Sequence, residues 1–431
     1  MLKFNLGFYY SDLYSHIQLS NFWLRGEDLL NENRYGDNKG LHNYYLNPVL
    51  GIFTYWSGAY GLFFAHLGLI FLGTWQWLRY HNKTKLDTLL LFALFLGPMA
   101  YWFWDNRPYG WHAELLYFPL VFLCAQNLKR ANLKIAIVWA ICISLVREDG
   151  ILLIWALGIG FLLIDKKSKP LSKEIVFFSL GCLVLFIAGI VLIEHFSVGA
   201  SRLNKALTLE AIGDAEIFKN LAFNFGGYLL FALPLLLLLL IYYPIKYTFI
   251  TIIISLPIFF GAWVSGLYYL PDTYHSVLWQ PRMIALWSVA LGQLVLLGDS
   301  KNAAFRLPIS LGIVLLWGLQ FITLVVLRQH NLFTMTTDIL REGKIYSQDK
   351  RYAVVKQIAK STPHEAFVVV PYEYFHLFHK HKIIWPDHLE NALHQPDLIV
   401  AREEDSAWSK AYESMHITAE KEGIIIRRKV K

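Results

Sequence analysis

The chain has 431 residues, of which 56% are hydrophobic and 16% are charged, and its formal net charge is +7. Its mean hydropathy of +0.40 exceeds that of ordinary soluble domains, so composition excludes a typical soluble globular protein and predicts an integral membrane protein. The positive charge falls largely between apolar runs, and we therefore interpret it as membrane topology rather than nucleic-acid binding.

Residues 1–50 form a polar first segment. The stretch YSDLYSHIQLSNFWLRGEDLL places Leu13, Ile17 and Leu24 at helical spacing, which predicts a helix lying along the membrane interface with Ser11 or Asp12 near its start. No hydrophobic segment precedes Phe4, although this polar segment is expected outside the cytoplasm. We therefore expect that one upstream helix is missing from the chain.

Residues 51–327 consist largely of apolar runs, which predict a polytopic α-helical bundle with about ten membrane spans. The predicted spans are residues 55–79, 86–104, 111–128, 132–147, 149–165, 174–194, 222–243, 247–266, 282–298 and 307–327. Lys and Arg are more frequent in the loops of one face, which predicts that this face is cytoplasmic. The protein is then expected in the cytoplasmic (inner) membrane, with residues 1–50 and the tail extracytoplasmic.

Residues 328–431 have the mixed polar and apolar texture of a soluble domain. The segment RYAVVKQIAKST has helical spacing and is followed by Pro363, which cannot continue a helix. Short β-branched runs, AFVVVPY, KIIWP, DLIVARE and GIIIRRK, predict strands. Together they predict a C-terminal extracytoplasmic α/β domain.

Ionisable residues recur at the predicted outer turns. Singly, each has a plain structural interpretation, because charges at helix ends readily reach water. The consecutive triplet Arg147, Glu148 and Asp149 is harder to explain in this way, because a tight turn between two spans leaves little room for three charges. The outer positions also include Asp12, His42, His112, Glu114, Tyr274, His275 and Arg282.

Four places and the tail carry a resemblance to a known family. They are Ser11-Asp12-Leu13, His42 followed by Pro48, Trp111-His112 with Pro119, Val146-Arg147-Glu148-Asp149, and the tail stretches IAKSTPHEAFVVV, KIIWPD and PDLIVARE. On these residues the chain resembles the uncharacterised membrane protein family called domain of unknown function 2079. That family resembles the GT-C glycosyltransferases, which take sugars from polyprenyl-phosphate carriers, so the resemblance implies that the predicted helix bundle is GT-C-like. Ser11 and Trp111 depart from its pattern by replacing phenylalanines, and Arg147 replaces a lysine.

The resemblance implies roles for the outer residues. Asp12 matches the first-loop acid of GT-C enzymes, which serves as base or orients the acceptor, and Glu114 and Glu148 are further catalytic candidates. Arg147 and Arg282 are candidates for holding the carrier phosphate. A divalent cation could sit among the acids, although no spacing demands a metal. The remaining substrate-binding candidates are His42, His112, Asp149, Tyr274 and His275.

The leading functional hypothesis is transfer of a sugar from a polyprenyl-phosphate carrier to an extracytoplasmic glycan, lipid or protein acceptor, with membrane lipids as the other partners and no nucleic acid. A transporter or lipid flippase is the alternative, and a noncatalytic envelope assembly protein is a third. The ionisable residues crowd one rim of the predicted bundle, whereas transport calls for charges near span midpoints. This distribution favours surface chemistry.

Overall fold

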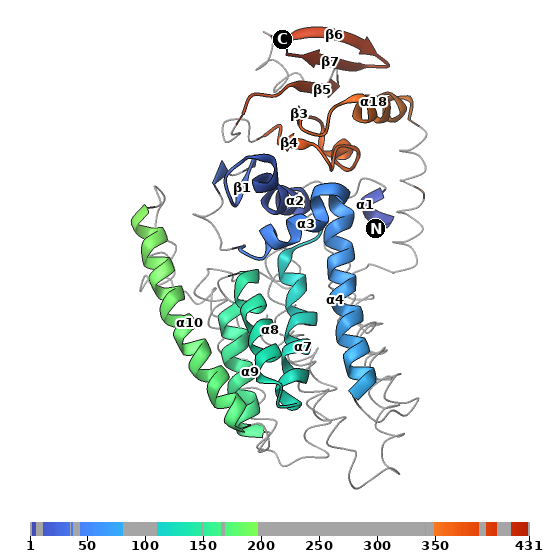
Figure 1. Cartoon of the computed structure of the whole chain (residues 1–431). Helices are drawn as coiled ribbons and strands as arrows, with labels where there is room; N and C mark the ends of the chain where they lie inside the picture. The colour runs from blue at the N-terminus through green and yellow to red at the C-terminus, as the bar shows by residue number, and fades with distance from the viewer. Residues whose placement is uncertain are drawn as a thin grey trace, which may run out of the picture. The chain divides into compact units, whose positions relative to one another are not determined.

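The computed structural model of the protein describes residues 2–5, 12–34, 36–37, 44–80, 110–147, 150–164, 169–196, 341, 349–387, 394–402 and 415–429 (Figure 1). The chain forms two compact units. Unit 1 combines residues 1–65, 107–113 and 328–431, and unit 2 combines residues 66–106 and 114–327. Unit 1 is thus assembled from three parts of the sequence that are far apart along the chain.

The N-terminal part of unit 1 is a set of short elements packed closely together. They are α1 (Leu2–Asn5), α2 (Asp12–Asn21), η1 (Phe22–Arg25), β1 (Asn31–Glu32), β2 (Gly36–Asp37), α3 (Asn47–Ser57) and the first residues of α4 (Ala59–Tyr80). Helix α3 starts with Pro48 in its first turn, where a missing backbone N–H has no cost. Helices α2 and α3 touch so closely that a Cβ atom at Gly51 would lie 2.2 Å from the Ser20 carbonyl oxygen.

The described residues of the tail of unit 1 include a mixed five-stranded sheet and a helix that precedes it. Its strands follow the order β4-β3-β5-β7-β6, in which β3 pairs parallel with β4 and β5, and β7 pairs antiparallel with β5 and β6. Their bounds are β3 (Phe367–Val369), β4 (Lys382–Ile384), β5 (Leu398–Arg402), β6 (His416–Lys421) and β7 (Ile424–Arg428), with η4 (Tyr372–Leu377) between β3 and β4. Val369, Ile384, Ile399 and Ala401 form the apolar core.

Helix α18 (Lys350–Ser361) precedes the sheet and has clear local end signals. The Asp349 side chain accepts a hydrogen bond from the Arg351 backbone N–H at 2.9 Å, which caps the first turn. The helix ends before Thr362 and Pro363. The predicted helix and the four predicted strand segments are confirmed here, whereas β6 was not predicted.

The N-terminal segment packs directly on the tail. The Gln18 side-chain amide donates to the Ile383 carbonyl at 2.6 Å, and the Asn33 amide donates to the same carbonyl at 3.0 Å. The Tyr14 ring meets Phe375 edge to face at 5.2 Å between centroids. Residues 13–21 of α2 are all buried, so this helix does not present the exposed polar face expected of a helix at a membrane interface. The two segments must also lie in the same compartment.

In its described residues, unit 2 contains the remainder of α4 and four further α-helices. They are α7 (Tyr117–Lys129), α8 (Leu133–Val146), α9 (Gly150–Ile164) and α10 (Lys169–Phe196), which follow η3 (Ala113–Leu116). Helix α7 packs on α8, α8 on α9, and α9 on α10 (Figure 1). The Gln126 amide donates to the Gly73 carbonyl at 3.1 Å, which ties α7 to α4.

The prediction of about ten membrane spans is wrong for the described part of the chain. Among the residues placed there, only Ala59–Arg79 is both long and apolar enough to cross a membrane, and Leu133–Val146 and Gly150–Leu162 are shorter apolar helices. Helix α8 has 14 residues, and at about 1.5 Å per residue it covers well under the roughly 30 Å of hydrocarbon. Hydropathy detected the apolar runs but not where turns interrupt them. The predicted spans 86–104, 222–243, 247–266, 282–298 and 307–327 lie outside the described residues.

Candidate functional site

Asp12 lies at the start of α2 in unit 1. A carboxylate in a first turn complements the positive end of the helix dipole. One carboxylate oxygen pairs with Nη1 of Arg34, and the other lies 3.2 Å from Nε2 of His112. The Asp12 side chain is 15% exposed and that of His112 is 3% exposed. The Asp12 carboxylate is therefore partly accessible to solvent, whereas the imidazole of His112 is buried.

His16 follows Asp12 by one helical turn and projects from the same face of α2, because residues four apart lie above one another. Its Nδ1 atom lies 2.8 Å from the Asn47 side-chain nitrogen. Its ring meets Trp111 and His112 edge to face, with centroid distances of 5.4 and 5.5 Å. These contacts join α2, the start of α3 and the segment around residue 112.

The loop after α2 brings Arg34 to Asp12. Glu32 is fully buried, and its Oε2 atom accepts hydrogen bonds from the Ser15 hydroxyl at 3.1 Å and from the Arg34 backbone N–H at 2.9 Å. The Gln18 side-chain oxygen accepts from the Asn33 backbone N–H at 2.8 Å. These bonds fold the loop onto α2, so the arginine is positioned by backbone contacts as well as by its own charge.

Glu114 and Arg147 form a second pair, which lies in unit 2. Glu114 Oε1 lies 3.1 Å from Arg147 Nη1, and their side chains are 0% and 7% exposed. The Tyr117 hydroxyl donates to the Arg147 carbonyl at 3.4 Å. Such deep burial of both partners makes this pair an internal feature of the helix packing.

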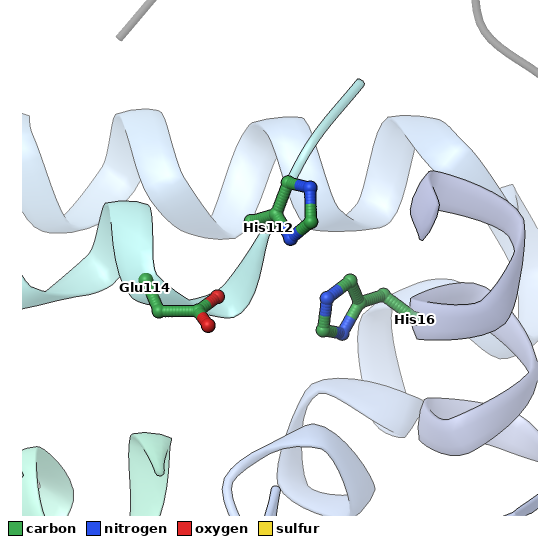
Figure 2. Close-up of side chains that lie close together, drawn as sticks. All are labelled: His16, His112 and Glu114. Carbon is green, nitrogen blue, oxygen red and sulfur yellow. The ribbon is translucent and has the colours of Figure 1, made fainter. Parts of the chain in front are cut away.

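Figure 2 shows His16, His112 and Glu114, three buried side chains whose candidate ligand atoms all lie within 4.8 Å of one another. Glu114 follows His112 by two residues, so the two side chains are held in the same short segment of the chain. Two imidazoles and one carboxylate are a ligand set that Zn²⁺ and other divalent transition ions accept. The predicted divalent cation thus has a group of residues that could hold it.

The surroundings of the two histidines fit a metal site. A metal-binding histidine commonly uses its second ring nitrogen to donate to a carboxylate or carbonyl oxygen. The Asp12 carboxylate lies beside one ring nitrogen of His112, and the Asn47 side-chain amide lies beside one ring nitrogen of His16. The Asn47 side-chain oxygen is buried without a hydrogen-bond partner among the described residues. A half-turn of this amide would bring the oxygen to His16 Nδ1 and leave Nε2 for a ligand.

No family model, curated protein or solved structure matches the chain. The resemblance to GT-C glycosyltransferases therefore stays a prediction. The chemistry of the site has to be derived from its own residues.

The structure places four of the predicted site residues, and they form two contacts, Asp12 with His112 and Glu114 with Arg147. The other predicted site residues lie outside the described residues; they are His42, Glu148, Asp149, Tyr274, His275 and Arg282.

Sequence reasoning missed His16, Glu32, Arg34 and Asn47. One signal was available, because Asp12 and His16 stand four residues apart in a predicted helix and must share a face. Nothing local in the sequence indicated that Arg34 or Asn47 would meet them, since both contacts depend on how the loop and α3 fold back onto α2.

Proposed function

We propose that the cluster of Asp12, His16, Arg34 and His112 is the active site of a membrane-associated glycosyltransferase that transfers a sugar from a polyprenyl-phosphate carrier to a hydroxyl acceptor outside the cytoplasm. The observation that carries the proposal is a partly exposed carboxylate held between a guanidinium and a buried imidazole. The resemblance of Asp12 to the first-loop acid of GT-C enzymes supports the same assignment.

Asp12 is the general base in this proposal. Its carboxylate accepts the proton of the acceptor hydroxyl while that oxygen bonds to the anomeric carbon of the sugar, and the bond from that carbon to the carrier phosphate breaks. Arg34 and His112 fix the orientation of the carboxylate, since each contacts a different oxygen. Each carboxylate oxygen has two lone pairs and can still accept a substrate proton.

The leaving carrier phosphate needs positive charge rather than an acid. Arg34, which is 17% exposed beside Asp12, can turn N–H donors toward a phosphate while it pairs with the carboxylate. A divalent cation bound by His16, His112 and Glu114 would supply further charge stabilisation for such a leaving group.

The proposal is tested with the full chain in detergent or proteoliposomes, by measuring sugar transfer from a panel of polyprenyl-phosphate sugars to hydroxyl acceptors. Asp12→Asn should lower turnover by about 10²- to 10⁴-fold, because an amide cannot accept the proton. Asp28→Asn is the matched control, since Asp28 is an exposed acid of the same N-terminal segment, and it should retain full turnover.

Two results would contradict the proposal. One is wild-type turnover in a folded Asp12→Asn protein. The other is the absence of transfer from every donor of the panel by a wild-type preparation that melts cooperatively. Chelator treatment adds a separate test of the cation. If turnover is lost with the chelator and returns when one divalent ion is added, and if this response to the ion is altered in His16→Ala, the ion is assigned to this group.

A further inference from the structure

A second site of different character lies elsewhere in unit 1. A pocket of about 470 Å³ is lined by residues of α1, the first turn of α4, α18 and the segment 364–381. Its volume falls within the range of small-molecule sites. None of the four residues proposed for the active site lines it, so it requires its own explanation.

The pocket is basic. Lys356, Lys360 and Lys380 line it, and none of the described residues that line it is Asp or Glu. Among the described residues, none of these lysines has a carboxylate within ion-pair distance. The acids nearest along the chain are engaged elsewhere, since Glu365 pairs with Arg25 and Lys382, and Glu373 with Arg402. Within the described part of the chain, the three lysines of the pocket are therefore not neutralised by ion pairs.

Helix α18 carries two of these cations at an unfavourable spacing. Lys356 and Lys360 are four residues apart and share one face of the helix, where like charges repel. A bound anion between them would remove this repulsion.

Histidines supply hydrogen-bonding groups to the same pocket. His376 Nδ1 lies 3.0 Å from the Glu373 carbonyl, and His381 Nε2 lies 3.1 Å from the Thr362 carbonyl, so both atoms carry protons and donate. His379 Nδ1 accepts from the Ala59 backbone N–H at 3.3 Å, which places its proton on Nε2. Burial is the main cause that lowers the pKa of His376 to about 4, of His379 to about 3 and of His381 to about 4. At neutral pH the lysines therefore carry the charge.

One wall of the pocket is aromatic and closely packed. Phe4 meets Tyr60 and His379 edge to face, with centroid distances of 5.4 and 5.1 Å. Behind His379, Gly58 has a φ of +56°, and a Cβ atom there would lie 2.2 Å from His379 Nδ1. Only glycine combines this backbone conformation with so close an approach.

We propose that this pocket binds a small ligand that carries a phosphate monoester, with the phosphate among Lys356, Lys360 and Lys380 and the adjoining part of the ligand beside Phe4 and Tyr60. A dianionic phosphate matches several lysine charges. A soluble phosphorylated compound and a lipid head group share this chemistry. The inference is independent of the glycosyl transfer proposed for Asp12.

The test uses the full chain in detergent and calorimetric titration with phenyl phosphate, with benzyl alcohol as the uncharged comparison. Phenyl phosphate should bind, benzyl alcohol should not, and added salt should weaken binding. The triple substitution Lys356→Gln, Lys360→Gln and Lys380→Gln should weaken binding at least ~10-fold. Lys350→Gln is the matched control, because Lys350 is exposed on the same helix and does not line the pocket, and it should bind as the wild type does.

Two further arms make the outcome decisive. Sedimentation with phosphatidylcholine vesicles, with and without phosphatidic acid, separates the ligand sources, because only a lipid head-group site should add lysine-dependent binding to the acidic vesicles. If the triple variant fails to fold, Lys360→Gln at an exposed position should weaken phenyl phosphate binding by about 3-fold. The proposal is overturned if the wild type binds neither phenyl phosphate nor acidic vesicles, or if folded lysine variants bind as tightly as the wild type.

Discussion

The two units place polarity in opposite ways. In unit 1, α2 buries Ser15, His16, Gln18 and Ser20, and each of these side chains has a hydrogen-bond partner. In unit 2, α8 and α10 are apolar yet leave large hydrophobic side chains exposed, among them Val138 at 53% and Leu185 at 72%. Helix α2 of unit 1 thus has buried polar side chains that are hydrogen-bonded, whereas α8 and α10 of unit 2 have apolar side chains on their exposed faces.

This difference shows that hydropathy identifies the apolar segments of the chain but does not indicate which surfaces pack against one another. A buried polar group is costly without a partner, so the polar side chains of α2 specify which surfaces must meet it. Apolar side chains are less selective, because any apolar neighbour of suitable shape will serve. The candidate active site lies in the unit whose contacts are the more specific.

The largest expected effect is at the buried ion pair of Glu114 and Arg147 in unit 2. Glu114→Leu or Arg147→Met alone should destabilise the protein by about 3–5 kcal/mol, because each breaks a buried ion pair. The double variant should recover most of this loss. Denaturant unfolding of the four proteins in detergent, followed by tryptophan fluorescence, measures the coupling. Single variants that each lose less than about 1 kcal/mol would show that water reaches the pair.

A smaller effect is expected at the polar interior of unit 1. Gln18→Leu removes a donor to the Ile383 carbonyl and an acceptor for the Asn33 backbone N–H, which should cost about 1–3 kcal/mol. Hydrogen exchange should also become faster in β4. Gln357→Leu, at an exposed position of α18, should change stability by about 0.5 kcal/mol or less. Equal effects of the two substitutions would mean that hydrogen bonding does not hold α2 on the tail.

The smallest effect is expected at the partly exposed ion pairs of Glu27. Burial alone raises the pKa of this carboxyl, but hydrogen bonds from His394 and Lys382 outweigh burial and hold the pKa below its usual 4.5. The folded state thus favours the carboxylate. Its stabilisation is present above pH 4.5 and is lost as the pH falls through the lowered pKa.

Glu27→Gln should therefore lower stability at neutral pH by about 1 kcal/mol or less, and the difference from the wild type should vanish in acid. Melting temperatures measured across the acid range test this. Glu420→Gln, at an exposed position of β6, is the control and should follow the wild type at every pH. A deficit of Glu27→Gln that persists unchanged in acid would assign the loss to packing rather than to charge.

The candidate site was only partly predictable. Asp12 and His112 were identified as polar residues at the edges of apolar or helical segments, which is a local property. Their contact joins positions a hundred residues apart, and Arg34 and Asn47 reach the cluster only through the fold of the N-terminal segment. Glu114, which pairs with Arg147, was a catalytic candidate from the sequence, but the complete burial of its side chain was not evident there.

The sequence by itself determined those features that depend on neighbours within a few residues. They include a helix start near Ser11 or Asp12, helix α18 and its end before Pro363, the strands β3, β4, β5 and β7, and the apolar character of α4, α8 and α9. Only the tertiary structure decided that a single helix among the described residues is both long and apolar enough to span a membrane, that β6 completes the sheet, and that α2 is buried against β4. The physical reason is that helical periodicity and capping are short-range, whereas a bond such as that from Gln18 to Ile383 requires the closure of a long loop, whose partner no local pattern specifies.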